Sequence, residues 1–138
     1  MELIRRNTDY ALRALVSMGK NGGKVWSVRK LAQETRVSDA FLRKIMQRLS
    51  QARIVVSQRG SVGGFSLARE ASKIKVLDVM EALQGPVAIN RCFLDNSCPK
   101  FANCELRENL RKPQLELVKV LGKMTLKQLA KERSGRCK

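Results

Sequence analysis

The chain of 138 residues contains no histidine, a side chain that often serves as a general base in enzymes and as a metal ligand. It also has no paired carboxylates in a recognisable catalytic motif and no nucleotide-binding signature. These absences argue against a metal-dependent or nucleotide-dependent enzyme. We therefore predict that the protein is not an enzyme and has no catalytic residues.

Long apolar segments are missing as well, since the uncharged apolar runs extend over only a few residues. A membrane-spanning helix needs roughly 20 such residues. The N-terminal segment, with Arg5 and Arg6, has neither the apolar stretch nor the cleavage site of a signal peptide. We expect a cytoplasmic protein without membrane contact, in which clustered cysteines bind metal or do redox work instead of forming structural disulfides.

Acidic residues are scarce: 12 Asp and Glu stand against 28 Lys and Arg, which gives a net charge of +16. Residues 1–69 carry 14 basic and 4 acidic residues, whereas residues 70–138 carry 14 and 8. This charge predicts a polyanionic partner, with nucleic acid ahead of a membrane surface. A generally basic surface without a partner would have the same composition. We expect a phosphate-binding face in the N-terminal half.

Three helices are predicted in that half. Hydrophobic periodicity indicates the first over residues 3–19, which the turn KNGG at 20–23 ends. Ser27 and Ser38 are suitable N-caps for two shorter helices, and the second helix has a basic, polar face opposite its apolar one. Two such helices are typical of a helix-turn-helix, although an ordinary helical hairpin would have the same pattern.

Residues 54–69 (IVVSQRGSVGGFSLAR) predict two strands joined by a glycine-rich tip. Glycine permits positive φ and close backbone approach to another molecule. A basic hairpin directly after a helix-turn-helix is a wing, and Arg59 at its base is placed to contact phosphate or enter a minor groove. A phosphate cradle for a nucleotide is the weaker alternative, because the P-loop Lys-Ser/Thr and a following helix are absent.

The remaining chain predicts a helix over residues 76–84, a cysteine-rich loop and a long amphipathic helix from about residue 105. We expect Pro113 to kink or split that helix. Its apolar stripe has too little partner surface in so small a domain, so we expect it to pack on a second copy; the stripe comprises Leu106, Leu110, Leu117, Leu121 and Met124. Thr125 would cap a last helix over residues 126–132, before a disordered tail in which Cys137 is a bystander.

The predicted fold is therefore mainly α, a winged helix-turn-helix with a two-stranded β wing and a long C-terminal dimerisation helix. We divide the chain into a DNA-binding region (1–84), a cluster-binding loop (85–104), and the dimerisation helix with its tail (105–138).

Cys92, Cys98 and Cys104 follow one another at intervals of six residues. Three thiolates on a flexible loop can hold one face of an iron–sulfur cluster or a soft metal ion. Structural zinc usually takes four ligands with shorter spacers, so zinc fits less well. A disulfide redox switch and an empty, degenerate site remain open.

The motifs NTDYALRAL (7–15), RGSVGGFSLAR (59–69), KVLDVMEAL (75–83) and TLKQL (125–129), with the cysteine triplet, give a resemblance over nearly the whole chain. The chain resembles the Rrf-two family of bacterial winged-helix transcription regulators. The resemblance implies a homodimer with crossing C-terminal helices, two heads that read a palindromic operator in double-stranded DNA, and an iron–sulfur cluster that switches DNA affinity. Some family members bind no cluster, and those that do carry the cysteine triplet.

The fourth cluster ligand differs between branches of that family. The cluster-biogenesis branch has a histidine three residues after the last cysteine, where this chain has Arg107, which cannot deprotonate to bind iron. The nitric-oxide-sensing branch uses an aspartate from the partner's first helix, and the matching residue is Asp9. Asp9 could instead pair with a nearby arginine on the helix surface, and Glu105 and Glu108 are competing ligands.

The resemblance thus implies a repressor that senses nitric oxide or redox state through a 4Fe–4S cluster, in preference to 2Fe–2S. The cluster ligands would be Cys92, Cys98 and Cys104, with the partner subunit's Asp9. The alternatives are a regulator of cluster biogenesis or iron homeostasis, a thiol-redox regulator without a cluster, and an interaction module that has lost DNA binding. The predicted DNA-binding residues are Ser27, Ser38, Asp39, Ala40, Arg43, Lys44, Gln47, Arg48, Arg59, Ser61, Gly63 and Gly64.

Overall fold

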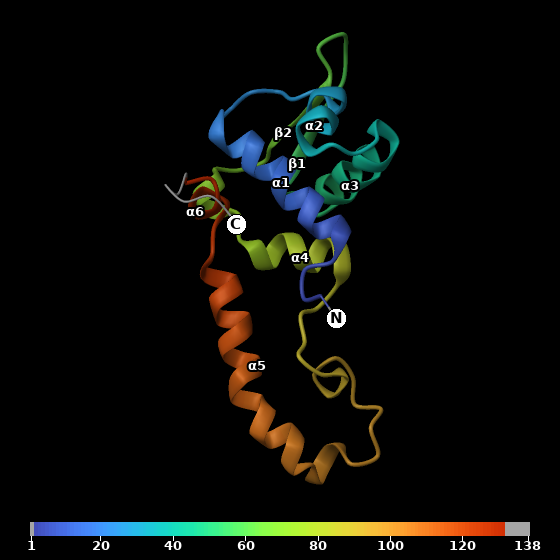
Figure 1. Cartoon of the computed structure of the whole chain (residues 1–138), viewed down its shortest axis with the longest axis vertical. Helices are drawn as coiled ribbons and strands as arrows, with labels where there is room; N and C mark the ends of the chain where they lie inside the picture. The colour runs from blue at the N-terminus through green and yellow to red at the C-terminus, as the bar shows by residue number, and fades with distance from the viewer. Residues whose placement is uncertain (1, 132–138) are drawn as a thin grey trace.

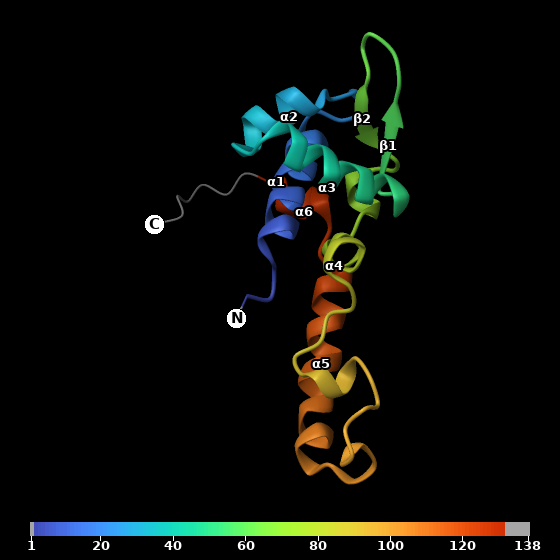
Figure 2. The same cartoon turned by 90° about the vertical axis from the view of Figure 1, so that its right-hand side faces the viewer.

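The computed structural model describes residues 2–131, which form a winged head and a long stem (Figure 1). The chain leaves the head after α4, runs through the cysteine loop, and returns along α5, so the stem consists of a loop and a helix side by side in both views (Figure 2). The helices are α1 (Arg6–Lys20), α2 (Val28–Thr35), α3 (Asp39–Gln51), α4 (Val76–Gln84), α5 (Glu105–Lys123) and α6 (Leu126–Leu129).

The helix-turn-helix forms as its caps predict. The Ser27 hydroxyl accepts the Lys30 N–H at 3.2 Å, and the Ser38 hydroxyl accepts the Phe41 N–H at 3.2 Å. These bonds satisfy N–H groups that the first turn of each helix leaves without a partner. The apolar face of α3 is buried against the other helices of the head, with Leu42, Ile45, Met46 and Leu49 in the core.

The wing is an antiparallel hairpin of β1 (Val55–Gln58) and β2 (Gly64–Leu67). Trp26, just before α2, pairs with Phe65 on the free edge of β2 through two backbone hydrogen bonds, of 2.7 and 2.8 Å. A β-carbon on Gly64 would collide with the Trp26 carbonyl. Only glycine therefore fits at this position. We expected the glycines of the wing to permit close approach to another molecule. At Gly64, the backbone that lies close is instead that of the chain's own Trp26.

Backbone hydrogen bonds attach the segment that follows α5 to the head. The Val76 N–H donates to the Met124 carbonyl at 2.9 Å, and the Leu126 N–H donates to the Ile74 carbonyl at 3.0 Å. Leu126 is fully buried, and its helix α6 packs against α1. The predicted Thr125 cap is present and accepts the Gln128 N–H at 3.2 Å. The head and the end of the stem thus share a single apolar core.

Two boundaries differ from the predictions. The first helix begins at Arg6 and not at residue 3, because the Gln84 side chain holds the preceding segment in a non-helical arm. The Gln84 amide donates to the Leu3 carbonyl at 2.8 Å and accepts the Arg5 N–H at 3.2 Å. The last helix ends at Leu129, and residues 132–138 with Cys137 lie outside the described part of the chain.

The long helix α5 is continuous through Pro113, so of the two effects expected of this proline, a kink or a split, the split does not occur. Its apolar residues serve two purposes. Leu117, Leu121 and Met124 pack against the head, whereas Leu106, Leu115 and Val120 are more than half exposed. Among residues 2–131, no helix combines the length and apolar character needed to cross a membrane.

Replacing Leu126 with Ala should lower the free energy of unfolding by about 2–5 kcal/mol, because it leaves a cavity where the C-terminal return enters the core. Urea unfolding followed by circular dichroism would measure this. Leu129→Ala is the matched control, because Leu129 is on the same helix but 38% exposed, and we expect a much smaller loss. Equal losses for the two variants would contradict the role assigned to Leu126.

Candidate DNA interface and cysteine loop

An open groove lies between α3, the N-terminus of α2 and the wing. Seven of the predicted DNA-binding residues line it, and they come from all three elements: Ser27, Asp39, Arg43, Gln47, Arg59, Gly63 and Gly64. Three arginines, at 29, 43 and 59, and a single carboxylate, Asp39, lie along the groove. The groove is therefore basic, and its position between a recognition helix and a wing suits a DNA duplex.

The other predicted interface residues lie outside the groove. Ala40 and Lys44 are exposed on α3, and Ser61 is exposed at the wing tip. Ser38 is exposed, but its hydroxyl is used as the α3 cap. The Arg48 guanidinium is turned toward α4, where it donates to the Ala82 carbonyl at 3.4 Å. The structure thus brings Arg43 and Gln47 to the groove and directs Arg48 elsewhere.

Sequence reasoning missed Arg29, Ser57 and Gln58, which also line the groove. The place of Arg29 in the first turn after the Ser27 cap was the available signal, because a helix N-terminus that faces a groove attracts anions. Ser57 and Gln58 gave no comparable signal, since polar residues of a strand next to a turn are common on any surface.

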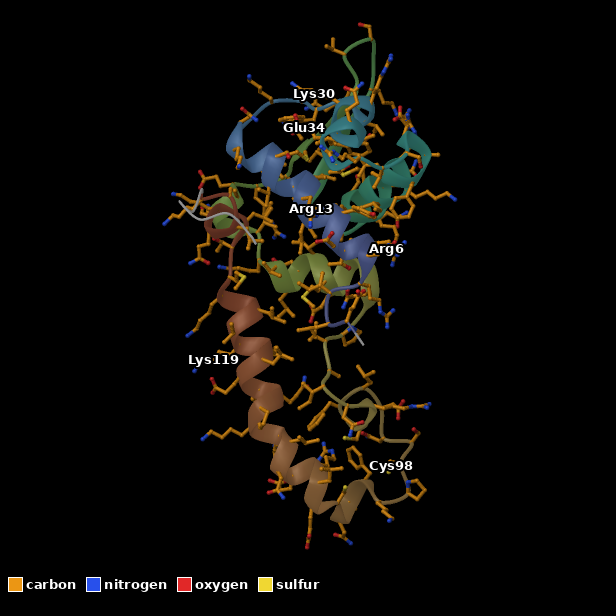
Figure 3. The ribbon with its side chains drawn as sticks, viewed as in Figure 1. Arg6, Arg13, Lys30, Glu34, Cys98 and Lys119 are labelled. Carbon is orange, nitrogen blue, oxygen red and sulfur yellow. The ribbon has the colours of Figure 1, made fainter. Side chains whose placement is uncertain are left out.

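The three cysteines lie on the loop between α4 and α5, and Cys98 is at the far end of the stem from the head (Figure 3). Cys92 is in the short helix η2 (Arg91–Phe93), Cys98 is exposed, and Cys104 is the N-cap of α5, following η3 (Phe101–Asn103). All three are free thiols. Within residues 2–131, no three potential ligands are close enough to hold a metal ion, so the loop must close further to bind one.

Hydrogen bonds nevertheless attach both ends of the loop to α5. The Gln114 amide accepts the Ile89 N–H at 2.9 Å and donates to the Val87 carbonyl at 2.8 Å. At the other end, the Cys104 sulfur accepts the Arg107 N–H at 3.4 Å. Hydrogen bonds to cysteine sulfur are one means by which proteins stabilise bound iron–sulfur clusters. The donor set of three free thiols on one tethered loop fits such a cluster.

Asp9 is not near these cysteines within one chain, because α1 is part of the head and Cys98 is at the opposite end of the stem (Figure 3). The Asp9 carboxylate instead pairs with the Arg13 guanidinium one turn later, at 2.9 Å. The hydrogen bond from Arg13 to Asp9, followed by their charge attraction, raises the pKa of Arg13. Any iron that Asp9 binds would therefore be held by the cysteine loop of another chain, and it would compete with Arg13 for the carboxylate.

Comparison with known proteins extends these observations. Residues 4–132 match the Rrf2 family, described as an iron-dependent transcriptional regulator. The chain is 35% identical to protein aau3 of Rhizobium meliloti over 132 residues, which are 94% of this chain and 86% of that protein. It is 31% identical to the transcriptional regulator NsrR of Oceanobacillus iheyensis over 131 residues, 93% of this chain and 89% of that protein.

Among solved structures, CymR, the global cysteine regulator of B. subtilis, superposes with a TM-score of 0.78 at 26% identity and covers 94% of this chain and 97% of that one. The likeness therefore extends over nearly the whole chain and is not limited to a helix-turn-helix that many regulators share. Because the family match spans residues 4–132, this chain belongs to the Rrf2 (Rrf-two) family of transcriptional regulators.

Proposed function

We propose that the protein is a homodimeric repressor whose affinity for DNA is switched by an iron–sulfur cluster that responds to nitric oxide or redox state. One observation carries this proposal: three evenly spaced free thiols lie on a single loop that Gln114 and the Cys104 cap fasten to α5. The family's description as iron-dependent and the similarity to NsrR support it.

The DNA-binding half of the proposal rests on the basic groove. With α3 in the major groove, Arg43 and Gln47 would reach base edges, since arginine and glutamine both form paired hydrogen bonds with bases. Arg59 would contact phosphate or the minor groove from the wing. Arg29, at the start of α2, would contact the phosphate backbone beside them.

The dimer is supported by the exposed apolar residues of α5. Leu106 and Val120 have exposed fractions of 61 and 53%, and they lie on one face of α5, since they are nearly four whole turns apart. Leu115, 62% exposed, lies on the opposite face. A second copy of the chain would cover Leu106 and Val120, and two heads related by a two-fold axis would read a palindromic operator.

The cluster ligands in this proposal are Cys92, Cys98, Cys104 and the partner subunit's Asp9, around a 4Fe–4S cluster. A carboxylate is a harder ligand than thiolate, so the iron next to it would be exchangeable and open to small molecules. Since α1 packs against α2 and α3, a bond from Asp9 to the other chain's loop would fix the orientation of the heads. Release of Asp9 would let the heads rotate and change their half-site spacing.

A thiol-redox regulator without a cluster is the second candidate, and the resemblance to CymR, a cysteine regulator, favours it. In that case the loop cysteines would respond by oxidation to a disulfide or a related form. A regulator of cluster biogenesis or iron homeostasis would use the same fold, although Arg107 removes the histidine ligand of that branch.

Replacing Arg43 or Arg59 with Ala should weaken DNA binding by about 1–3 kcal/mol, because each removes a charged contact in the groove. Fluorescence anisotropy at moderate salt, on an operator selected from random duplexes, would measure it. Lys119→Ala is the control for charge alone, because Lys119 lies on the stem far from the groove (Figure 3). Equal affinities for all three variants would rule out this groove as the interface.

The protein purified without oxygen should contain iron and sulfide and absorb visible light. Cys98→Ser should lose most of both, because only two thiolates would remain on the loop. Iron and sulfide analysis with an absorption spectrum would test this. A colourless wild-type protein that still binds DNA would favour the thiol-redox candidate over the cluster.

Asp9→Ala should retain the thiolate-bound cluster but change its spectrum and its response to nitric oxide. Titration with nitric oxide, followed by absorbance and by DNA binding, would measure the change. Arg13→Ala is the matched control, since it breaks the same ion pair and keeps the carboxylate. If both variants behave alike, or if Asp9→Ala behaves as wild type, Asp9 is not a ligand.

A further inference from the structure

Arg107 occupies an unusual position in the cysteine loop. Its guanidinium carbon lies 4.2 Å from the centroid of the Phe101 ring and 5.5 Å from that of the Phe93 ring. These rings belong to η3 and η2, the two short helices of the loop. One side chain from the first turn of α5 thus joins both halves of the loop to the stem.

The loop has few other attachments to the rest of the molecule. Its own hydrogen bonds are local, such as those from Ser97 to Asp95 and from the Arg91 N–H to Asn90. Gln114 holds only the entry to the loop, at Val87 and Ile89. All side chains from Leu94 to Lys100 are exposed. The two arginine–aromatic contacts are therefore the links through which the middle of the loop is held in place.

The positions of the aromatic rings relate these contacts to the cysteines. Phe93 directly follows Cys92, and Phe101 lies three residues after Cys98 and three before Cys104. Fixing both rings on Arg107 therefore restricts the positions of all three thiols. The backbone of Arg107 acts in the same direction, because its N–H donates to the Cys104 sulfur.

The guanidinium also has unused hydrogen-bonding capacity. Its Nε–H is buried and has no hydrogen-bond partner. Stacking uses the faces of the guanidinium and leaves its N–H groups free in the plane, and the group remains charged under all ordinary conditions. A buried donor without an acceptor costs free energy unless an acceptor arrives. Cysteine and cluster sulfur atoms, which carry negative charge, would be suitable acceptors.

We propose that Arg107 is the positioning residue of the cysteine loop: it assembles the loop before any cluster binds, and then supplies a fixed positive charge and N–H donors to the cluster's sulfur. The second role rests on the proposed function, whereas the first does not. The three thiols of the iron-free loop are not yet close enough to hold a metal ion, but rings fixed on Arg107 leave the loop fewer conformations to lose when it closes, which lowers the ordering cost of binding. Where the cluster-biogenesis branch has a histidine that binds iron, this chain would thus have an arginine that holds the loop without binding iron.

The first role can be tested on the iron-free protein with endoproteinase Lys-C. Lys100 is the sole lysine between Lys75 and Lys112, and it directly precedes Phe101, so cleavage there reports release of the ring from Arg107. In Arg107→Leu we expect cleavage after Lys100 to be about tenfold faster, since cleavage tracks the population of the open loop. Arg111→Leu is the matched control, because it removes one charge a turn further along an exposed face.

Phe101→Leu breaks the same contact from the other side and should accelerate cleavage similarly. The double variant should be little faster than either single one, because the two residues act through one contact. Unchanged urea midpoints would show that the head remains folded in each variant. If Arg107→Leu is cleaved at the rate of Arg111→Leu, the assembling role is wrong.

The second role requires the loaded protein. Arg107→Lys keeps the charge but not the planar stacking or the Nε donor, so it should be cleaved after Lys100 faster than wild type yet retain part of the electrostatic effect. Because this substitution adds a lysine at position 107, the fragment cut after Lys100 is identified by its mass. We expect the cluster's reduction potential to be more negative in Arg107→Leu than in Arg107→Lys, because nearby positive charge favours the reduced state. Equal potentials would overturn the electrostatic role. A wild-type protein that never binds iron would overturn the proposed function, while the cleavage rates would still decide the assembling role.

Discussion

The return of the chain to the head is the constraint on which the rest of the structure depends. The backbone bonds between Ile74–Val76 and Met124–Leu126, and the buried Leu126 side chain, fix both ends of the stem to one core. The chain therefore leaves the head after α4 and returns to it along α5, with the cysteine loop between these two helices (Figure 1). Without that return, α5 would have no defined direction, and the loop would have no defined place relative to the groove.

This geometry separates the two functional regions of the chain. The basic groove lies at the wing end, and the cysteine loop lies at the other end of the stem, with the core between them. Within one chain, α5 packs against α4, and α4 packs against α1 and α3, so a change at the loop would pass through several contacts before it reached the groove. Contact with the α1 of a second chain would be a shorter route, because α1 packs directly against α2 and α3. A switch of the proposed kind would therefore act between the two subunits of the proposed dimer.

Polar side chains with paired hydrogen bonds hold the flexible segments in this arrangement. Gln84 fastens the N-terminal arm to α4 and also accepts the buried Thr8 hydroxyl at 2.8 Å. Gln114 fastens the entry of the cysteine loop to α5, one residue after Pro113. Each amide uses both its donor and its acceptor, which is the efficient way to fix a backbone segment that has no secondary structure of its own. Arg107 performs the same task for the rest of the loop through aromatic contacts.

The sequence by itself determined the features that depend on local interactions. The caps at Ser27, Ser38 and Thr125, the buried face of α3 and the wing strands were predicted correctly, because each depends on residues close together in the chain. Tertiary structure alone decided what Gly64 packs against, where Arg48 points, and that Arg107 bridges Phe93 and Phe101. It also decided that α5 buries Leu121 but leaves Leu106 exposed. These outcomes depend on elements far apart in the chain, and periodicity shows which residues share a face without showing what that face meets.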